Sequence, residues 1–152
     1  MKNKNLLTAL LIAPCLGASA LFAGTPAQDK AFVDKYKAAF EAGDKATLQS
    51  FLYTVGANPM ALEFYKMMVL EGSGSKIGKI ELLDLSPEEV KEAEAIEEGP
   101  GGEKTKLPLK PTKKLKISNE TKEGSGSSTS SKSCLVAEND GKFVIPVPVA
   151  AK

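Results

Sequence analysis

Residues 39–48, with the sequence AFEAGDKATL, join the end of one predicted helix to the start of the next. Gly43 can adopt the left-handed backbone conformation that ends a helix, and the Asp44 carboxylate can accept hydrogen bonds from the first N–H groups of the following helix. Upstream of this break an apolar stripe recurs at helical spacing, at Phe32, Tyr36 and Phe40. The stretch therefore predicts a helix with one face on the core, a sharp break and a second short helix.

Three helix-start patterns, each containing a proline, predict where helices begin. Residues 25–28 (Thr-Pro-Ala-Gln) and 86–89 (Ser-Pro-Glu-Glu) both have the capping-box pattern with proline at the first helical position. They begin the first helix and a short acidic helix that extends to about Glu98. Asn58 and Pro59 begin a third helix that ends near Glu71, and its apolar residues are Met60, Phe64, Met67 and Met68. We expect the methionines of this helix to fill the core beneath a sheet, with an adaptable binding groove as the alternative.

The remaining segments predict a mainly antiparallel sheet. Residues 76–85, 113–121, 133–138 and 143–149 have the composition and alternation of strands. Asn139-Asp140-Gly141 is a strong hairpin-turn sequence. The intervening residues 123–131 are rich in serine and glycine, so we expect them to form a flexible loop.

Side-chain alternation predicts which face of each strand is buried. Pro146 and Pro148 lie two residues apart, so their missing N–H groups share one side, and we expect the last strand to be a terminal edge strand. The predicted inward face comprises Leu115, Ile117, Cys134, Val136, Phe143, Ile145, Val147 and Val149.

The N-terminal residues 1–20 are predicted to be a bacterial-type signal peptide. Two lysines precede an apolar run at residues 6–13, and residues 18–20 (Ala-Ser-Ala) form the best cleavage site, with a cut after Ala23 as the alternative. A permanent membrane anchor and lipidation at Cys15 are weaker interpretations of the same segment. Residues 25–152 then form a single exported domain, periplasmic or secreted, that is free of the membrane after signal cleavage.

Composition removes several classes of function. The chain has no histidine and no arginine, and its net charge is +1 at pH 7. The usual Ser-His-Asp and Cys-His catalytic systems and the common zinc sites are therefore excluded. A chain so close to neutral has no global field to attract nucleic acid. We expect no cofactor and no metal, and Cys134 alone remains after signal cleavage, so no intrachain disulfide can form.

The order of the elements and residues 39–48 resemble the nuclear transport factor 2-like (cystatin-related α+β roll) superfamily. The resemblance implies an α+β fold, with two or three N-terminal helices packed on a curved, mainly antiparallel sheet. It also implies a cone between helices and sheet that serves in some members as a ligand pocket or catalytic cavity. Without histidine, the phenols that could line such a cone are Tyr36, Tyr53 and Tyr65.

These features predict a binding or protein-interaction module that is non-catalytic rather than an enzyme. Two alternatives use the cone: a lyase or isomerase of the polyketide-cyclase-like type, or a binder of small apolar ligands. A purely structural envelope protein is a third alternative. The expected partner is an unidentified protein or a small apolar ligand, with a homodimer as a further candidate.

Overall fold

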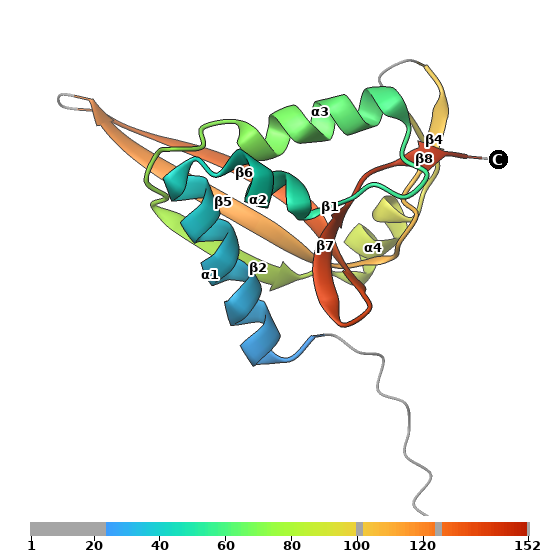
Figure 1. Ribbon diagram of the computed structural model, residues 1–152, viewed down its shortest axis with the longest axis horizontal. Coiled ribbons are helices and arrows are strands. Elements are labelled where there is room, and N and C mark those ends of the chain that lie inside the picture. Colours follow the sequence, from blue (N-terminus) through green and yellow to red (C-terminus); the bar gives the residue numbers. More distant parts are fainter. Residues whose placement is uncertain (1–23, 100–101, 124–125, 152) are drawn as a thin grey trace, which may run out of the picture.

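The computed structural model describes residues 24–99, 102–123 and 126–151. It has an α+β fold, as predicted, with mainly antiparallel strands (Figure 1). No helix among the described residues is long and apolar enough to cross a membrane. The helices are α1 (Pro26–Ala42), α2 (Lys45–Ser50), α3 (Pro59–Leu70) and α4 (Pro87–Ala93).

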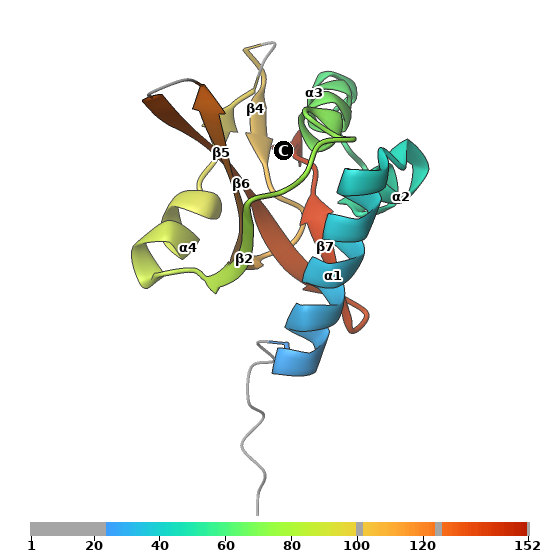
Figure 2. The same cartoon turned by 90° about the vertical axis from the view of Figure 1, so that its left-hand side faces the viewer.

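The strands form two sheets. The larger sheet has the order β1-β7-β6-β5-β2, and all its pairs are antiparallel except β1 with β7. Its strands are β1 (Leu52–Tyr53), β2 (Lys79–Asp84), β5 (Pro111–Glu123), β6 (Gly126–Asn139) and β7 (Lys142–Pro146). The smaller sheet has the order β3-β4-β8, with strands β3 (Glu97–Glu98), β4 (Lys104–Lys106) and β8 (Val149–Ala150). Figure 2 shows α1, α2 and α3 on one side of the larger sheet and α4 on the other.

The predicted helix ends are confirmed, with one exception. Thr25 and Gln28 form a reciprocal capping box at the start of α1, and Gly43 ends that helix with a φ of 66°. Asp44 then caps α2 through a 3.0 Å hydrogen bond from the Thr47 backbone N–H. The acidic helix α4 ends at Ala93 rather than near Glu98, because the chain turns and residues 97–98 pair with β4.

The core lies between α1 and the inner face of the larger sheet. Phe32, Tyr36 and Phe40 are all buried, which confirms the stripe predicted on the first helix. Six of the eight predicted inward strand residues are buried, whereas Cys134 and Val149 are half-buried. The buried six are Leu115, Ile117, Val136, Phe143, Ile145 and Val147.

The prediction of a flexible loop at residues 123–131 is wrong for Glu123 and residues 126–131, and residues 124–125 lie outside the described residues. β5 and β6 form one long hairpin, with Glu123 opposite Gly126 at its far end, and this ribbon extends away from the body of the molecule (Figure 1). Serine and glycine favour loops on average, but backbone pairing with β5 satisfies the N–H and C=O groups of the segment whatever its side chains.

The prediction of a terminal edge strand is also wrong. The Ile145 N–H donates to the Phe51 carbonyl at 2.7 Å, and the Val147 N–H donates to the Tyr53 carbonyl at 3.1 Å, so β1 covers the outer side of β7. Because backbone direction alternates, Pro146 faces β6, whose antiparallel ladder with β7 ends at Val144. The prolines thus end the hydrogen-bonded ladder between β6 and β7. The chain then continues to β8 in the smaller sheet.

Candidate functional site

The cone between the helices and the larger sheet is nearly filled. The cavity that remains there has a volume of about 20 Å³ and is bounded by Tyr36, Met68, Leu115, Lys132 and Cys134, among others. A space of this size holds about one water molecule. It has no room for a small organic ligand.

The three tyrosines predicted to line the cone do not meet in one cavity. Tyr36 is 1% exposed and its ring lies 5.3 Å from that of Phe51, inside the aromatic core. Tyr65 lines a second cavity of about 80 Å³ near Thr105, at the smaller sheet. Tyr53 lies on β1 and is half-buried. Burial, and then the neighbouring Cys134 thiol, raise the pKa of both Tyr36 and Tyr65, so these phenols stay protonated at neutral pH.

Cys134 and Lys132 lie on the inner face of β6, at the filled cone. Burial raises the pKa of the Cys134 thiol to about 12, which keeps it protonated and unreactive at neutral pH. The Lys132 ammonium donates to the carbonyls of Met68 at 3.3 Å and Glu71 at 2.6 Å, and it lies 4.8 Å from the centre of the Phe40 ring. Burial lowers the pKa of Lys132. This lysine therefore caps the C-terminal end of α3, which is a structural role.

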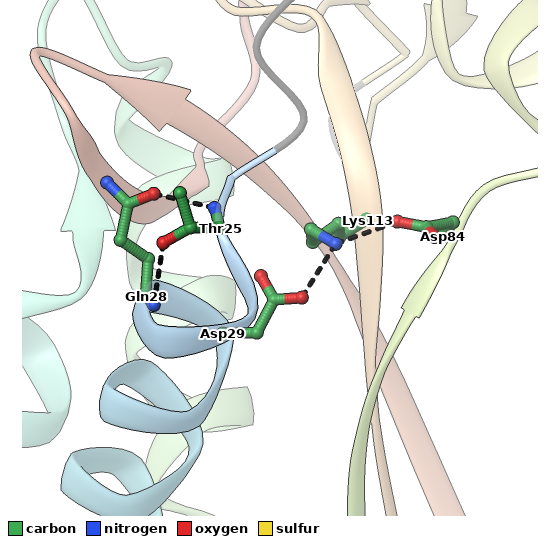
Figure 3. A network of polar contacts seen from close by, with 5 residues as sticks. All are labelled: Thr25, Gln28, Asp29, Asp84 and Lys113. Carbon is green, nitrogen blue, oxygen red and sulfur yellow. Dashed lines mark hydrogen bonds and ion pairs between the residues drawn. The ribbon is translucent and has the colours of Figure 1, made fainter.

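A second lysine, Lys113, lies on the same face of the sheet and is 3% exposed. Figure 3 shows its side chain between Asp29 and Asp84. The Lys113 ammonium binds Asp84 Oδ1 at 2.7 Å and Asp29 Oδ2 at 3.0 Å, so it joins β5 to β2 and to the first turn of α1. Burial opposes its charge, but the hydrogen bonds to both carboxylates outweigh burial and raise the pKa of Lys113. This residue was not predicted from the sequence, although its alternation with Leu115 places it on the inner face.

Two lysines near the start of β5 form ion pairs with acidic residues at α4. Lys114, on the opposite face of β5 from Lys113, pairs with Glu89 of α4, and Lys110 pairs with Glu94 at 3.0 Å. Among the described residues, no group of three or more acidic or cysteine side chains converges as a metal ion would require.

Among the described residues, three exposed large apolar side chains gather on α3. Met60, Phe64 and Met67 are 53%, 51% and 65% exposed, and we call these three residues the outer face of α3. The expectation that the methionines fill the core is wrong for Met60 and Met67. The helix turns a different stripe inward, with Ala61 and Val69 buried. Periodicity indicated an amphipathic helix, but α3 is apolar on both sides, so periodicity could not say which side is covered.

Comparisons with known proteins yield no identification. No protein-family model matches the chain, and no match was found among curated proteins or solved structures.

Proposed function

We propose that this protein is an exported, non-catalytic protein-interaction module whose docking surface is the outer face of α3. The observation that carries the proposal is the exposure of Met60, Phe64 and Met67 on successive turns of one helix. Aromatic residues often supply the dominant contacts of an interface, and methionine adapts its shape to varied partners. Adjacent large apolar side chains left in water are costly unless a partner covers them.

The filled cone supports surface binding over the two alternatives that need a cavity. A lyase or isomerase would need an acidic group beside a tyrosine in a space that admits substrate. The cavity beside Tyr36 has about 20 Å³ and no acidic residue among those that bound it, and the cavity beside Tyr65, which Glu97 also bounds, has about 80 Å³. A small organic ligand or substrate needs a pocket of about 300 Å³ or more, which is several times either volume.

Export and family membership belong to the same proposal. The lysines, apolar run and Ala-Ser-Ala site of residues 1–20 support cleavage by a signal peptidase, although that segment lies outside the described residues. Residues 39–48 and the order of elements support a nuclear transport factor 2-like ancestry. N-terminal sequencing of the protein from an envelope or secreted fraction should begin at Leu21 or Gly24. Recovery of the chain from washed membranes with Met1 still present would contradict export.

Site-specific photocrosslinking tests the docking surface. A benzophenone amino acid in place of Phe64 should give a discrete adduct in producing cells, because the ring is placed at the interface. The matched control carries the same group in place of Lys30, whose side chain is 76% exposed on α1. Adding Met60→Lys to the chain that carries the benzophenone at position 64 should abolish the adduct. Equal labelling from positions 64 and 30 would contradict the proposal.

A further inference from the structure

We propose that the outer face of α3 binds a second copy of this chain, with the two α3 helices antiparallel about a two-fold axis near Phe64. This inference rests on the proposed function, because it names the partner of that same surface. It is carried by the order of apolar and charged residues along the helix.

The apolar residues of this face are arranged symmetrically about its centre. In an antiparallel two-fold pair, residues equally far from the axis on opposite sides face each other. The midpoint between Met60 and Met67 falls within half a residue of Phe64. A two-fold axis at Phe64 therefore stacks the two phenylalanines and places each Met60 beside Met67 of the second copy.

The charges beside this face are centred one residue farther along the helix and are complementary. Glu63 and Lys66 bind each other at 2.8 Å, with side chains 70% and 36% exposed. Their midpoint also falls within half a residue of Phe64, so the two-fold axis places each Glu63 opposite Lys66 of the second copy. Both ion pairs can then form across the interface, at the edge of the apolar contact. The face is therefore complementary to a second copy of itself.

The position of α3 leaves room for a second copy. In both views of the ribbon, α3 lies at the periphery of the molecule (Figures 1 and 2). The helix has 12 residues, about 18 Å of length. Two such helices bury a small area compared with a standard interface. The expected dimer is therefore weak, with a Kd of roughly 10–100 μM.

Reversing one charge at a time separates self-association from simple stickiness. Glu63→Lys places two lysines opposite each other on both sides of the two-fold axis, and Lys66→Glu does the same with two glutamates. Each variant alone should dimerise at least about tenfold more weakly than wild type, because the repulsion occurs twice. An equimolar mixture of the two variants should recover dimers near wild-type affinity, since both pairs are again attractive. Both single variants lose the ion pair within the helix, and mixing does not restore it.

Sedimentation velocity of the purified chain, in the form recovered from producing cells, measures these constants. Circular dichroism of each variant checks that it folds, and Phe64→Lys should abolish the dimer. Recovery in the mixture supports the inference. A wild-type chain that stays monomeric to about 500 μM overturns it, as does a dimer that neither charge variant weakens. A monomeric wild type whose Phe64 crosslink joins a different protein would leave the proposed function intact, whereas loss of the crosslink as well would remove both.

Discussion

Helices α1 and α3 present the same kind of apolar stripe to opposite environments. Phe40 of α1 is fully buried and stacks on Tyr36, whereas Phe64 of α3 is 51% exposed. Both stripes have helical spacing, and each helix begins with a side-chain cap and proline. The difference arises in tertiary packing, because the α1 stripe meets the inner sheet face and the outer face of α3 meets solvent. An apolar stripe therefore indicates that a helix will bind something, and only the fold decides whether that is the protein's own core.

Truncating the two phenylalanines tests this comparison most directly. Phe40→Ala should lower the free energy of unfolding by about 3–5 kcal/mol, because it removes a buried ring and leaves a cavity. Phe64→Ala should lower it by about 1 kcal/mol or less, since its ring is already half in water. Urea titrations of both variants at low protein concentration give the two values. Similar losses would mean that α3 is covered by its own chain.

Replacing Lys113 tests how much its buried ion pairs on the inner face contribute to stability. Lys113→Met keeps the packing of the aliphatic part of the side chain but leaves Asp29 without its ammonium partner. The free energy of unfolding should fall by about 2 kcal/mol. This loss is smaller than for a fully buried ion pair because Asp84 is exposed. Lys30→Met, at an exposed ion pair on the same helix as Asp29, should cost within about 0.5 kcal/mol. Adding Asp29→Asn to Lys113→Met should recover part of the loss. A negligible effect of Lys113→Met would show that the network contributes nothing to stability.

The pH dependence of that loss has a definite sign. Burial opposes the charge of Lys113, but the two carboxylates outweigh burial and raise its pKa in the folded protein, so its contribution is complete below the unfolded pKa of about 10.4. The stability difference between wild type and Lys113→Met should therefore stay constant from neutral pH to about 10. This difference in free energy of unfolding should become smaller as the pH rises further and passes the raised pKa of Lys113.

Local signals predicted the helices well, because caps act within a few residues. Gly43 and Asp44 end one helix and begin the next through hydrogen bonds that span at most five residues. The smaller sheet was missed because its strands have only two or three residues, too few for any period to show. The first, serine-rich half of β6 and the short strand β1 were missed because pairing with distant segments decides them.

The candidate site was predicted less well than the fold. The tyrosines were chosen for a cone that the side chains of the core fill, so Tyr36 became part of the aromatic cluster. The outer face of α3 is visible in the sequence as Met60, Phe64 and Met67, yet the same residues fit a core helix equally well. Exposure is a property of the assembled fold, and it was the observation that sequence could not supply.

The Cys134 thiol tests how tightly the cone is closed. Burial raises its pKa to about 12, so at pH 8 the folded chain should react with a disulfide reagent about one to two orders of magnitude more slowly than the chain unfolded in urea. A Cys15→Ser background leaves this single thiol. Because the pKa of Cys134 is raised in the folded protein, the stability that its protonated thiol contributes is lost as the pH rises above about 9. The Cys134→Ala variant should therefore lose less free energy of unfolding than wild type over that pH range. Equal reaction rates in both states would mean that the cone opens readily.

The adjacent methionines give the smallest expected effect and the finest test. Met68 packs against the core and Met67 is 65% exposed, although both belong to one turn of α3. At low protein concentration Met67→Ser should change the free energy of unfolding by less than about 0.5 kcal/mol, whereas Met68→Ala should cost measurably more. At high concentration a dimer stabilises the folded state by mass action, so wild type should melt at a higher temperature as its concentration rises. Met67→Ser should weaken that concentration dependence, and Met68→Ala should keep it. If Met67→Ser destabilises the chain equally at all concentrations, Met67 belongs to the core of one molecule and the contrast between the two helices fails.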